Sequence, residues 1–96
     1  MNADLLTERF HHVLSSVLGI EAKALPANAS PDTVEAWDSL KNMYIIQALE
    51  EEFGVVFSDI EIFELADVSA LLDAVAKKTG TVFLEHPLAM SAAAAA

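Results

Sequence analysis

The tripeptide Asp38-Ser39-Leu40 is the part of the sequence best suited to chemistry. It stands where a stretch of helical periodicity begins, so either Asp38 or Ser39 is expected to cap a helix, a contribution of about 1 kcal/mol. A serine at a helix start is exposed and rigidly presented, and unpaired backbone N–H groups lie beside it. These groups and the helix dipole would stabilise a phosphodiester on the hydroxyl. Two interpretations therefore stand, a helix cap alone and a modification site.

The remaining residues do not support catalysis or metal binding. Adjacent histidines on a helix point about a quarter turn or more apart, so His11 and His12 are poorly placed to share a metal ion, and His86 is the only other histidine. The chain has no cysteine, which excludes disulfides, thiolate ligands and thiol nucleophiles. It contains no G-x-S-x-G segment, phosphate loop, dinucleotide fingerprint or calcium loop. No catalytic residue and no metal site are predicted.

Three glycines divide the chain into the helices that must position Ser39. Gly19, Gly54 and Gly80 each follow a helical stretch, and glycine is favoured there because it adopts the left-handed conformation without a clash. The main helices are predicted at about residues 3–18, 39–53 and 68–78. A capping box at Ser58 predicts a short helix over about residues 59–64.

The long connection between the first two main helices is punctuated by prolines, and apolar residues within it are expected to pin it to the core: Ile20, Leu25 and Val34. We see no strand pair, so the predicted fold is all-α. It is a small four-helix bundle with three main helices, one short helix and a long first loop. Residues 81–96 are Ala-rich and are expected to form a loosely ordered tail after one domain over residues 1–80.

The charge balance narrows the classes of partner. Fifteen acidic residues against five basic ones give a net charge of −10. This charge disfavours binding to nucleic acid or to an anionic membrane surface, and it favours steering toward basic protein partners. No apolar stretch reaches membrane-spanning length and no secretory signal is visible, so a cytoplasmic monomer is the expectation.

Three segments resemble one family. Asp38-Ser39-Leu40 resembles the D-S-L attachment motif of acyl carrier proteins. Residues 48–54 resemble the A-L-E-E-E-F segment that closes the second helix of that family, at matching distance from Ser39. Residues 28–30 resemble its loop signature, Asn-Ala-Ser. The resemblance covers about residues 3–79.

The resemblance implies a carrier and not an enzyme. Ser39 would receive 4′-phosphopantetheine from coenzyme A through a separate magnesium-dependent phosphopantetheinyl transferase, and the thiol of that arm would hold acyl groups as thioesters. Asp38 would help the transferase recognise the site, and Leu40 would enter its apolar cleft. Because the sulfur would come with the cofactor, the absence of cysteine agrees with this role.

The resemblance also implies contacts with other enzymes and with the cargo. The family uses acidic residues of its second helix to contact basic patches on acyl-transferring or acyl-activating enzymes. The matching residues in this sequence are Glu50 and Glu51, together with Glu52. An acyl chain would enter a cavity beside the second helix, for which the candidate lining residues are Met43, Ile45, Ile46 and Leu65. Ordinary core packing is the alternative for each of them.

Departures from the family pattern bear on the choice of partner. Trp37 stands where many fatty-acid carriers have glycine or alanine, and it would either contact a partner or anchor the loop. Lys41 and Tyr44 occupy positions that are usually acidic, which disfavours a basic partner surface. We therefore expect a specialised carrier for a polyketide, natural-product or lipid-modification pathway.

Other functions stay open at this point. Within the carrier class, the alternatives are housekeeping fatty-acid synthesis and an aminoacyl or peptidyl carrier. In other classes, the alternatives are an acidic helical interaction module without a prosthetic group and a small hydrolase that uses Ser39.

Overall fold

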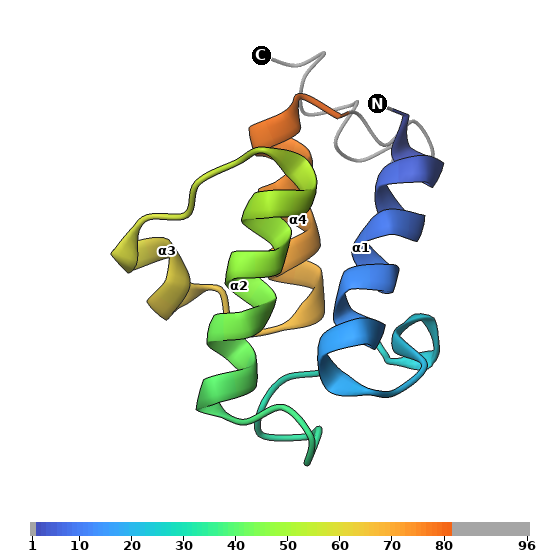
Figure 1. The fold of residues 1–96 in the computed structure, drawn as a ribbon, viewed down its shortest axis with the longest axis vertical. Coiled ribbons are helices and arrows are strands. Elements are labelled where there is room, and N and C mark those ends of the chain that lie inside the picture. Colours follow the sequence, from blue (N-terminus) through green and yellow to red (C-terminus); the bar gives the residue numbers. More distant parts are fainter. Residues whose placement is uncertain (1, 82–96) are drawn as a thin grey trace, which may run out of the picture.

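The computed structural model describes residues 2–81, which form helices joined by loops (Figure 1). The helices are α1 (Ala3–Leu18), the 3-10 helix η1 (Ala22–Ala24), α2 (Ser39–Phe53), α3 (Asp59–Glu64) and α4 (Val68–Thr79). No strand is present between residues 2 and 81, and the predicted all-α bundle is confirmed. Apart from Thr81, the predicted tail lies outside the described residues.

Local signals at the helix ends explain why the boundaries fall where the sequence places them. The side chain of Asn2 accepts a hydrogen bond from the Leu5 N–H at the start of α1. Ser58 and Glu61 form the predicted capping box of α3. Gly54 follows the last residue of α2 as its C-cap, with a φ of 64°. This left-handed conformation is unfavourable for residues that have a side chain.

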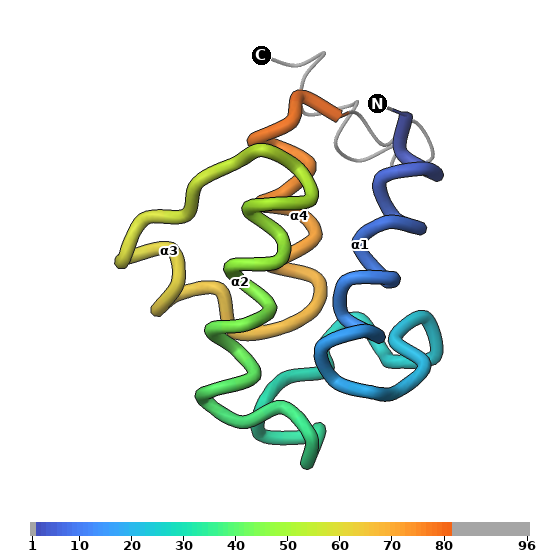
Figure 2. Tube along the Cα trace, in the orientation of Figure 1, coloured from blue at the N-terminus to red at the C-terminus, as the bar shows by residue number. Residues whose placement is uncertain are grey.

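The three main helices enclose one core. α1 runs antiparallel to α2, and α4 lies behind α2 (Figure 2). The core takes side chains from all three, and its largest fully buried members are Trp37, Phe10, Leu6, Leu14, Ile45, Leu49, Leu71 and Val75. Each of the three main helices contacts the other two.

The long loop between α1 and α2 is fastened at several points. Ile20, Leu25 and Val34 are partly buried against the core, as predicted. Its carbonyl groups also accept hydrogen bonds from the first N–H groups of α4: Val68 N–H donates to Ala29 O at 2.9 Å, and Ser69 N–H to Ala27 O at 2.8 Å. Because these N–H groups have no partner within the helix, the loop completes the start of α4.

The short helix α3 is attached differently. None of its six residues is buried, and it stands to one side of α2 and α4 (Figure 1). Lys78 of α4 donates to the Glu61 carboxylate at 2.9 Å, and the Lys78 ammonium lies 5.3 Å from the centre of the Phe57 ring. α3 is thus held by one ion pair, by its own Ile62, which packs partly buried against the core, and by the apolar residues on either side of it.

Candidate functional site

Ser39 is the first residue of α2, and its side chain is exposed. Asp38 is the N-cap: its Oδ1 atom accepts a hydrogen bond from the Lys41 N–H at 2.8 Å. The Ser39 hydroxyl forms no hydrogen bond with any residue between 2 and 81. Asp38 therefore performs the capping, and the hydroxyl of Ser39 points to solvent without a structural task.

The backbone around Ser39 suits a covalently attached anion. The N–H groups of Ser39 and Leu40 donate to no other described residue, as is usual in the first turn of a helix. They lie at the positive end of the α2 dipole, which stabilises negative charge on a group bound to the serine oxygen. No described side chain is hydrogen-bonded to that oxygen as a base would be, so the geometry favours a hydroxyl that is modified over one that attacks.

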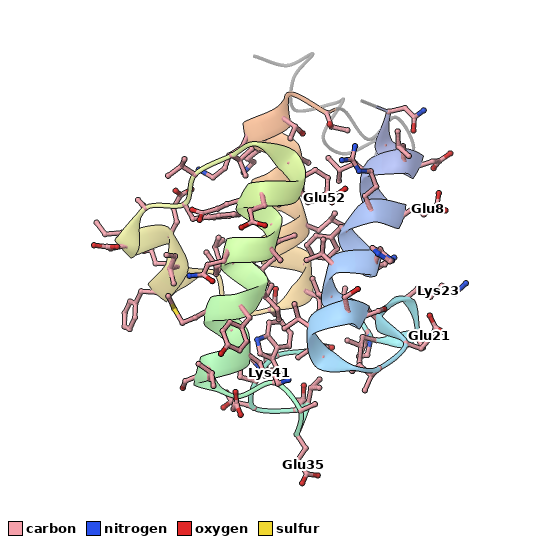
Figure 3. The ribbon with its side chains drawn as sticks, viewed as in Figure 1. Glu8, Glu21, Lys23, Glu35, Lys41 and Glu52 are labelled. Atoms are coloured by element: carbon pink, nitrogen blue, oxygen red, sulfur yellow. The ribbon has the colours of Figure 1, made fainter. Side chains whose placement is uncertain are left out.

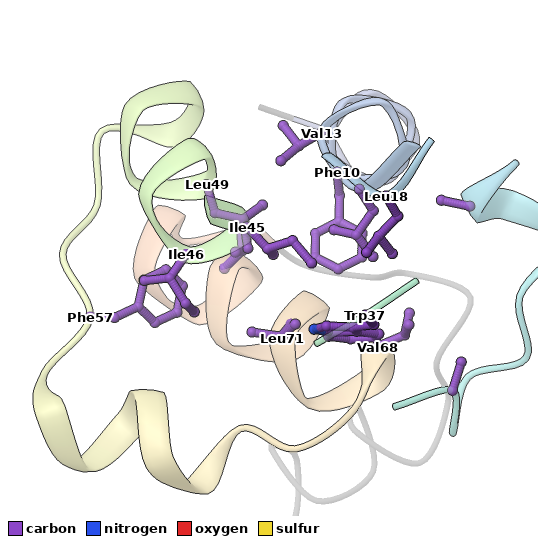
Figure 4. Packing of buried hydrophobic residues seen from close by; sticks show 14 of the residues in the cluster. Phe10, Val13, Leu18, Trp37, Ile45, Ile46, Leu49, Phe57, Val68 and Leu71 are labelled. Carbon is purple, nitrogen blue, oxygen red and sulfur yellow. The ribbon is translucent and has the colours of Figure 1, made fainter. Parts of the chain in front are cut away.

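Trp37 anchors the loop that delivers Ser39. Its side chain is 1% exposed, and Figure 4 shows it beside Leu71 and Val68 of α4. Its indole Nε1–H donates to Asn42 Oδ1 at 3.0 Å, and its backbone N–H donates to Val34 O at 3.0 Å. The predicted partner contact of Trp37 is wrong, because a buried indole cannot reach another protein; the loop-anchor alternative is right.

Asn42 is the site residue that sequence reasoning missed. It lies in the first turns of α2, and its side-chain oxygen accepts from the Trp37 indole. A buried indole N–H needs an acceptor, and this is the one signal that could have drawn attention to a polar residue near Trp37. The loop and α2 are thereby joined on both sides of Ser39.

The predicted acyl-cavity residues do not come together. Ile45 and Ile46 are buried in the core, at 0% and 2% exposure, as their packing alternative stated. Met43 is 45% exposed, so its assignment to an interior cavity is wrong: its position on α2 turns it outward. Leu65 is half-buried and lines a groove.

That groove of about 470 Å³ lies between α3 and α4. Its lining is mixed, with the apolar side chains of Leu65, Ala70 and Ala74 among charged ones, and it does not include Met43, Ile45 or Ile46. It is an open surface groove, and the Glu61–Lys78 ion pair belongs to its wall.

The acidic residues that end α2 have different surroundings. The Glu50 carboxylate accepts a hydrogen bond from the Phe57 N–H at 2.9 Å. Glu52 is paired with Arg9 of α1, whose guanidinium also donates to the Glu52 carbonyl oxygen and lies over the Phe53 ring. Glu51 is exposed. Of the acidic residues predicted to meet a partner, Glu50 and Glu52 thus hold the fold together, and Glu51 alone faces solvent without such a contact.

Lys41 and Tyr44 also differ in their surroundings. The Lys41 ammonium donates to the carbonyl oxygen of Val17, at the C-terminal end of α1, at 3.3 Å. A cation is favourable at that end of a helix. Tyr44 is 46% exposed and Leu40 is 59% exposed. Both side chains are therefore accessible, as contact with a partner requires. Figure 3 shows Lys41 at the lower end of α2 and Glu52 at its upper end.

The histidines of α1 border a second groove, of about 280 Å³, which lies between α1 and the start of the loop. Partial burial and the nearby Lys23 ammonium lower the pKa of His11 below its ordinary value. Within residues 2–81, no group of three or more His, Cys, Asp or Glu side chains could hold a metal ion. No helix in that same part of the chain is both long and apolar enough to cross a membrane.

The sequence matches one family model over most of the described residues. The model is described as "Phosphopantetheine attachment site", and it matches residues 8–75. An acyl carrier protein of Thermosynechococcus vestitus is 33% identical over 79 residues, which are 81% of this chain and 96% of that protein.

Two much longer proteins of Penicillium brasilianum are also similar. The non-reducing polyketide synthase prhL is 36% identical over 73 residues, and the non-reducing polyketide synthase ausA is 34% identical over 74 residues. The matched segments are 76% and 77% of this chain but only 3% of either synthase.

A solved structure described as "The ishigamide ketosynthase/chain length factor" contains a chain with the same fold. The TM-score is 0.62 at 23% identity, and the match covers 81% of this chain and 97% of that one. At this identity the likeness concerns the fold alone.

Proposed function

The chain belongs to the acyl carrier protein family, whose members bear a phosphopantetheine attachment site, and from this premise we propose that Ser39 carries the 4′-phosphopantetheine arm. The chain is accordingly a carrier and not an enzyme. When bound, the 4′-phosphopantetheine arm supplies a terminal thiol on which acyl groups are held as thioesters.

The observation that carries the proposal is the position of the Ser39 hydroxyl. It lies within the matched residues, at the first position of α2, exposed and without a hydrogen bond to any other described residue. A transferase needs a hydroxyl that is accessible and that can be changed without disturbing the fold. Because Asp38 caps the helix, loading of Ser39 would leave the cap in place.

The neighbours of Ser39 fix where the arm begins. Trp37 and Asn42 tie the loop to α2 on either side of the serine, so the attachment point moves little relative to the core. The N–H groups of Ser39 and Leu40 would balance the charge of the phosphodiester. These residues position and stabilise the linkage; they take no part in the chemistry of the acyl group.

We further propose that the cargo belongs to a polyketide, natural-product or lipid-modification pathway. Similarity to segments of two polyketide synthases supports this, as do Lys41 and Tyr44 at positions where fatty-acid carriers are usually acidic. Housekeeping fatty-acid synthesis is the second candidate, which the similarity to a free-standing acyl carrier protein favours. An aminoacyl or peptidyl carrier is the third candidate. In each case the partners would be a phosphopantetheinyl transferase and the enzymes that handle the acyl group.

Loading by a transferase tests the attachment residue. The chain is incubated with coenzyme A, magnesium and a broad-specificity phosphopantetheinyl transferase, and its intact mass is measured. We expect the mass to rise by one phosphopantetheine group in the unaltered chain and in Ser16→Ala, which removes an exposed serine of α1, but not in Ser39→Ala. Loading of Ser39→Ala would assign the arm to another residue, and failure of all three chains to load would contradict the proposed function.

A further inference from the structure

A set of hydrogen bonds spans Ser39 and fixes the backbone on both sides of it. Asp38 accepts from the Lys41 N–H with its carboxylate at 2.8 Å and from the Asn42 N–H with its carbonyl oxygen at 2.9 Å, as the cap of a helix does. One further bond runs between side chains, from the indole Nε1–H of Trp37 to Asn42 Oδ1 at 3.0 Å. Helix capping does not require this bond, so it adds a restraint beyond that of the cap.

The indole–amide bond joins α2 to the core. Trp37 is buried, and a buried N–H without an acceptor is costly, so the indole determines that the oxygen end of the Asn42 amide faces it. Asn42 is itself half-buried and lies three residues after Ser39. The core therefore reaches the attachment serine through two side chains in series, first the indole and then the amide.

The start of α2 has few other restraints. Between Trp37 and Ile45 no side chain is fully buried, so core packing does not hold this stretch of the helix. Within the described residues, two side-chain hydrogen bonds connect the stretch to the rest of the molecule: the indole–amide bond, and a longer one of 3.3 Å from the Lys41 ammonium to the Val17 carbonyl oxygen. Helix ends with few buried contacts open locally at a low cost in free energy. Loss of the Asn42 acceptor is therefore expected to loosen the turn that presents the serine.

On the basis of the proposed function, we infer that Asn42 is a positioning residue for loading: through the buried indole it holds the backbone of Ser39 in the conformation that a phosphopantetheinyl transferase binds. Without the acceptor, the folded chain occupies this conformation only part of the time, and its apparent affinity for the transferase falls by that fraction. Once bound, the serine has the competent conformation in every variant, so it reacts at the same rate. The KM for the chain therefore rises while kcat stays the same.

Loading kinetics with the carrier chain as the varied substrate test this inference. The reaction contains coenzyme A, magnesium and a broad-specificity phosphopantetheinyl transferase, and the loaded fraction is measured by intact mass. Asn42→Leu keeps the size of the side chain but removes the acceptor, and it is expected to raise KM by about fivefold or more with kcat within about twofold. Asn42→Asp keeps an accepting oxygen and should return KM to within about twofold of the original value. Asn28→Leu makes the same change at an exposed asparagine of the loop and should alter neither constant.

Trp37→Phe distinguishes positioning from direct contact with the transferase. The indole is enclosed in the core, so a transferase cannot touch it, but this variant removes the donor of the same bond and is also expected to raise KM at unchanged kcat. Because both changes break one bond, the double variant Trp37→Phe with Asn42→Leu should have a KM close to that of the worse single variant, rather than the product of the two effects.

Hydrogen exchange measures the loosening without any transferase. The Lys41 N–H donates to the Asp38 carboxylate, so its exchange rate, followed by NMR, reports on the turn that contains the serine. We expect this amide to exchange about fivefold faster in Asn42→Leu than in the unaltered chain, and at nearly the original rate in Asn42→Asp. The Glu61 N–H, which donates to the cap of α3 in the same way, is the reference and should not change.

The variants are compared at a temperature at which circular dichroism shows each of them to be folded. The proposal is overturned if Asn42→Leu raises KM but Trp37→Phe does not, which would make Asn42 a contact of the transferase, or if kcat falls at an unchanged KM. It is also overturned if the Lys41 amide exchanges no faster in Asn42→Leu. If Trp37→Phe does not fold, the two Asn42 variants decide. Failure of the unaltered chain to load would contradict the proposed function instead, and hydrogen exchange would still decide whether Asn42 holds the turn.

Discussion

At the scale of single residues, the attachment site divides its tasks among neighbours in the chain. Asp38 caps α2, and Trp37 is buried in the core. Ser39, which follows them, is exposed and neither caps the helix nor packs in the core. The residue proposed to carry the arm is therefore surrounded by residues that hold the backbone in place. This separation would let the serine be modified without loss of the helix that presents it.

Replacing the capping residue measures its contribution directly. Asp38→Ala removes the acceptor of the Lys41 N–H and is expected to lower the free energy of unfolding by about 1 kcal/mol. Asp38→Asn keeps an oxygen in the same place and should lose much less. Urea unfolding followed by circular dichroism gives both values, and an equal loss in the two variants would show that the aspartate acts through its charge rather than as a cap.

The residue scale also shows what the sequence could and could not predict. Ser39, Asp38 and Leu40 are identifiable from a short motif at a helix start, which is local information. Whether Trp37, Met43 and Glu50 are buried, exposed or hydrogen-bonded depends on how the elements pack together. That packing is decided by contacts between residues far apart in the chain. Helical periodicity does not reveal that a carboxylate at the end of α2 will bind the N–H of Phe57.

At the scale of elements, helix boundaries were predictable because caps and terminal glycines are local signals. The predicted limits of α1, α2 and α3 are confirmed, and α4 is one residue longer than predicted. The attachment of α3 was not predictable, because Glu61 and Lys78 lie seventeen residues apart. No residue of α3 is fully buried, and Ile62 packs only partly against the core, so the ion pair adds a contact that this short helix needs.

The tether of α3 has a pH dependence of known direction. The hydrogen bond from Lys78, followed by that from the Ser58 backbone, lowers the pKa of Glu61 below its ordinary value. Between the pKa of Glu61 in the folded chain and its ordinary value of about 4.3, the unfolded chain therefore binds more protons than the folded one. The stabilisation that the Glu61 carboxylate contributes is thus fully present above the ordinary pKa and is lost as the pH falls through the lower, folded value.

Removing the ammonium partner tests this tether. Lys78→Met is expected to raise the pKa of Glu61 toward its ordinary value, as measured by NMR titration of the Glu61 side-chain carboxyl carbon. Lys77→Met is the matched control, because Lys77 is paired with Asp73 instead. An unchanged pKa in Lys78→Met would mean that the capping box alone lowers it.

At the scale of the whole molecule, the excess of negative charge is poorly compensated. Arg9, Lys77 and Lys78 form ion pairs and Lys41 binds a backbone carbonyl, so the five basic residues leave most of the fifteen acidic ones without a cation. Repulsion among the remaining carboxylates opposes the compact state.

Salt should therefore stabilise the protein. We expect the melting temperature followed by circular dichroism to rise as NaCl is increased from about 0.01 M to about 0.5 M, because screening shortens the range of the repulsion from about 30 Å to about 4 Å. A divalent salt at equal ionic strength serves as a comparison for specific ion binding. A melting temperature that does not depend on ionic strength would show that the repulsion is negligible in the folded chain.

The burial of Trp37 has a practical consequence. It is the only tryptophan in the chain, and its indole is enclosed in the core two residues before the serine proposed to carry the arm. Its ultraviolet emission thus arises from one known place and will shift to longer wavelength when water reaches the ring. The chain contains its own optical reporter, which can follow the integrity of the attachment region in real time without any added dye.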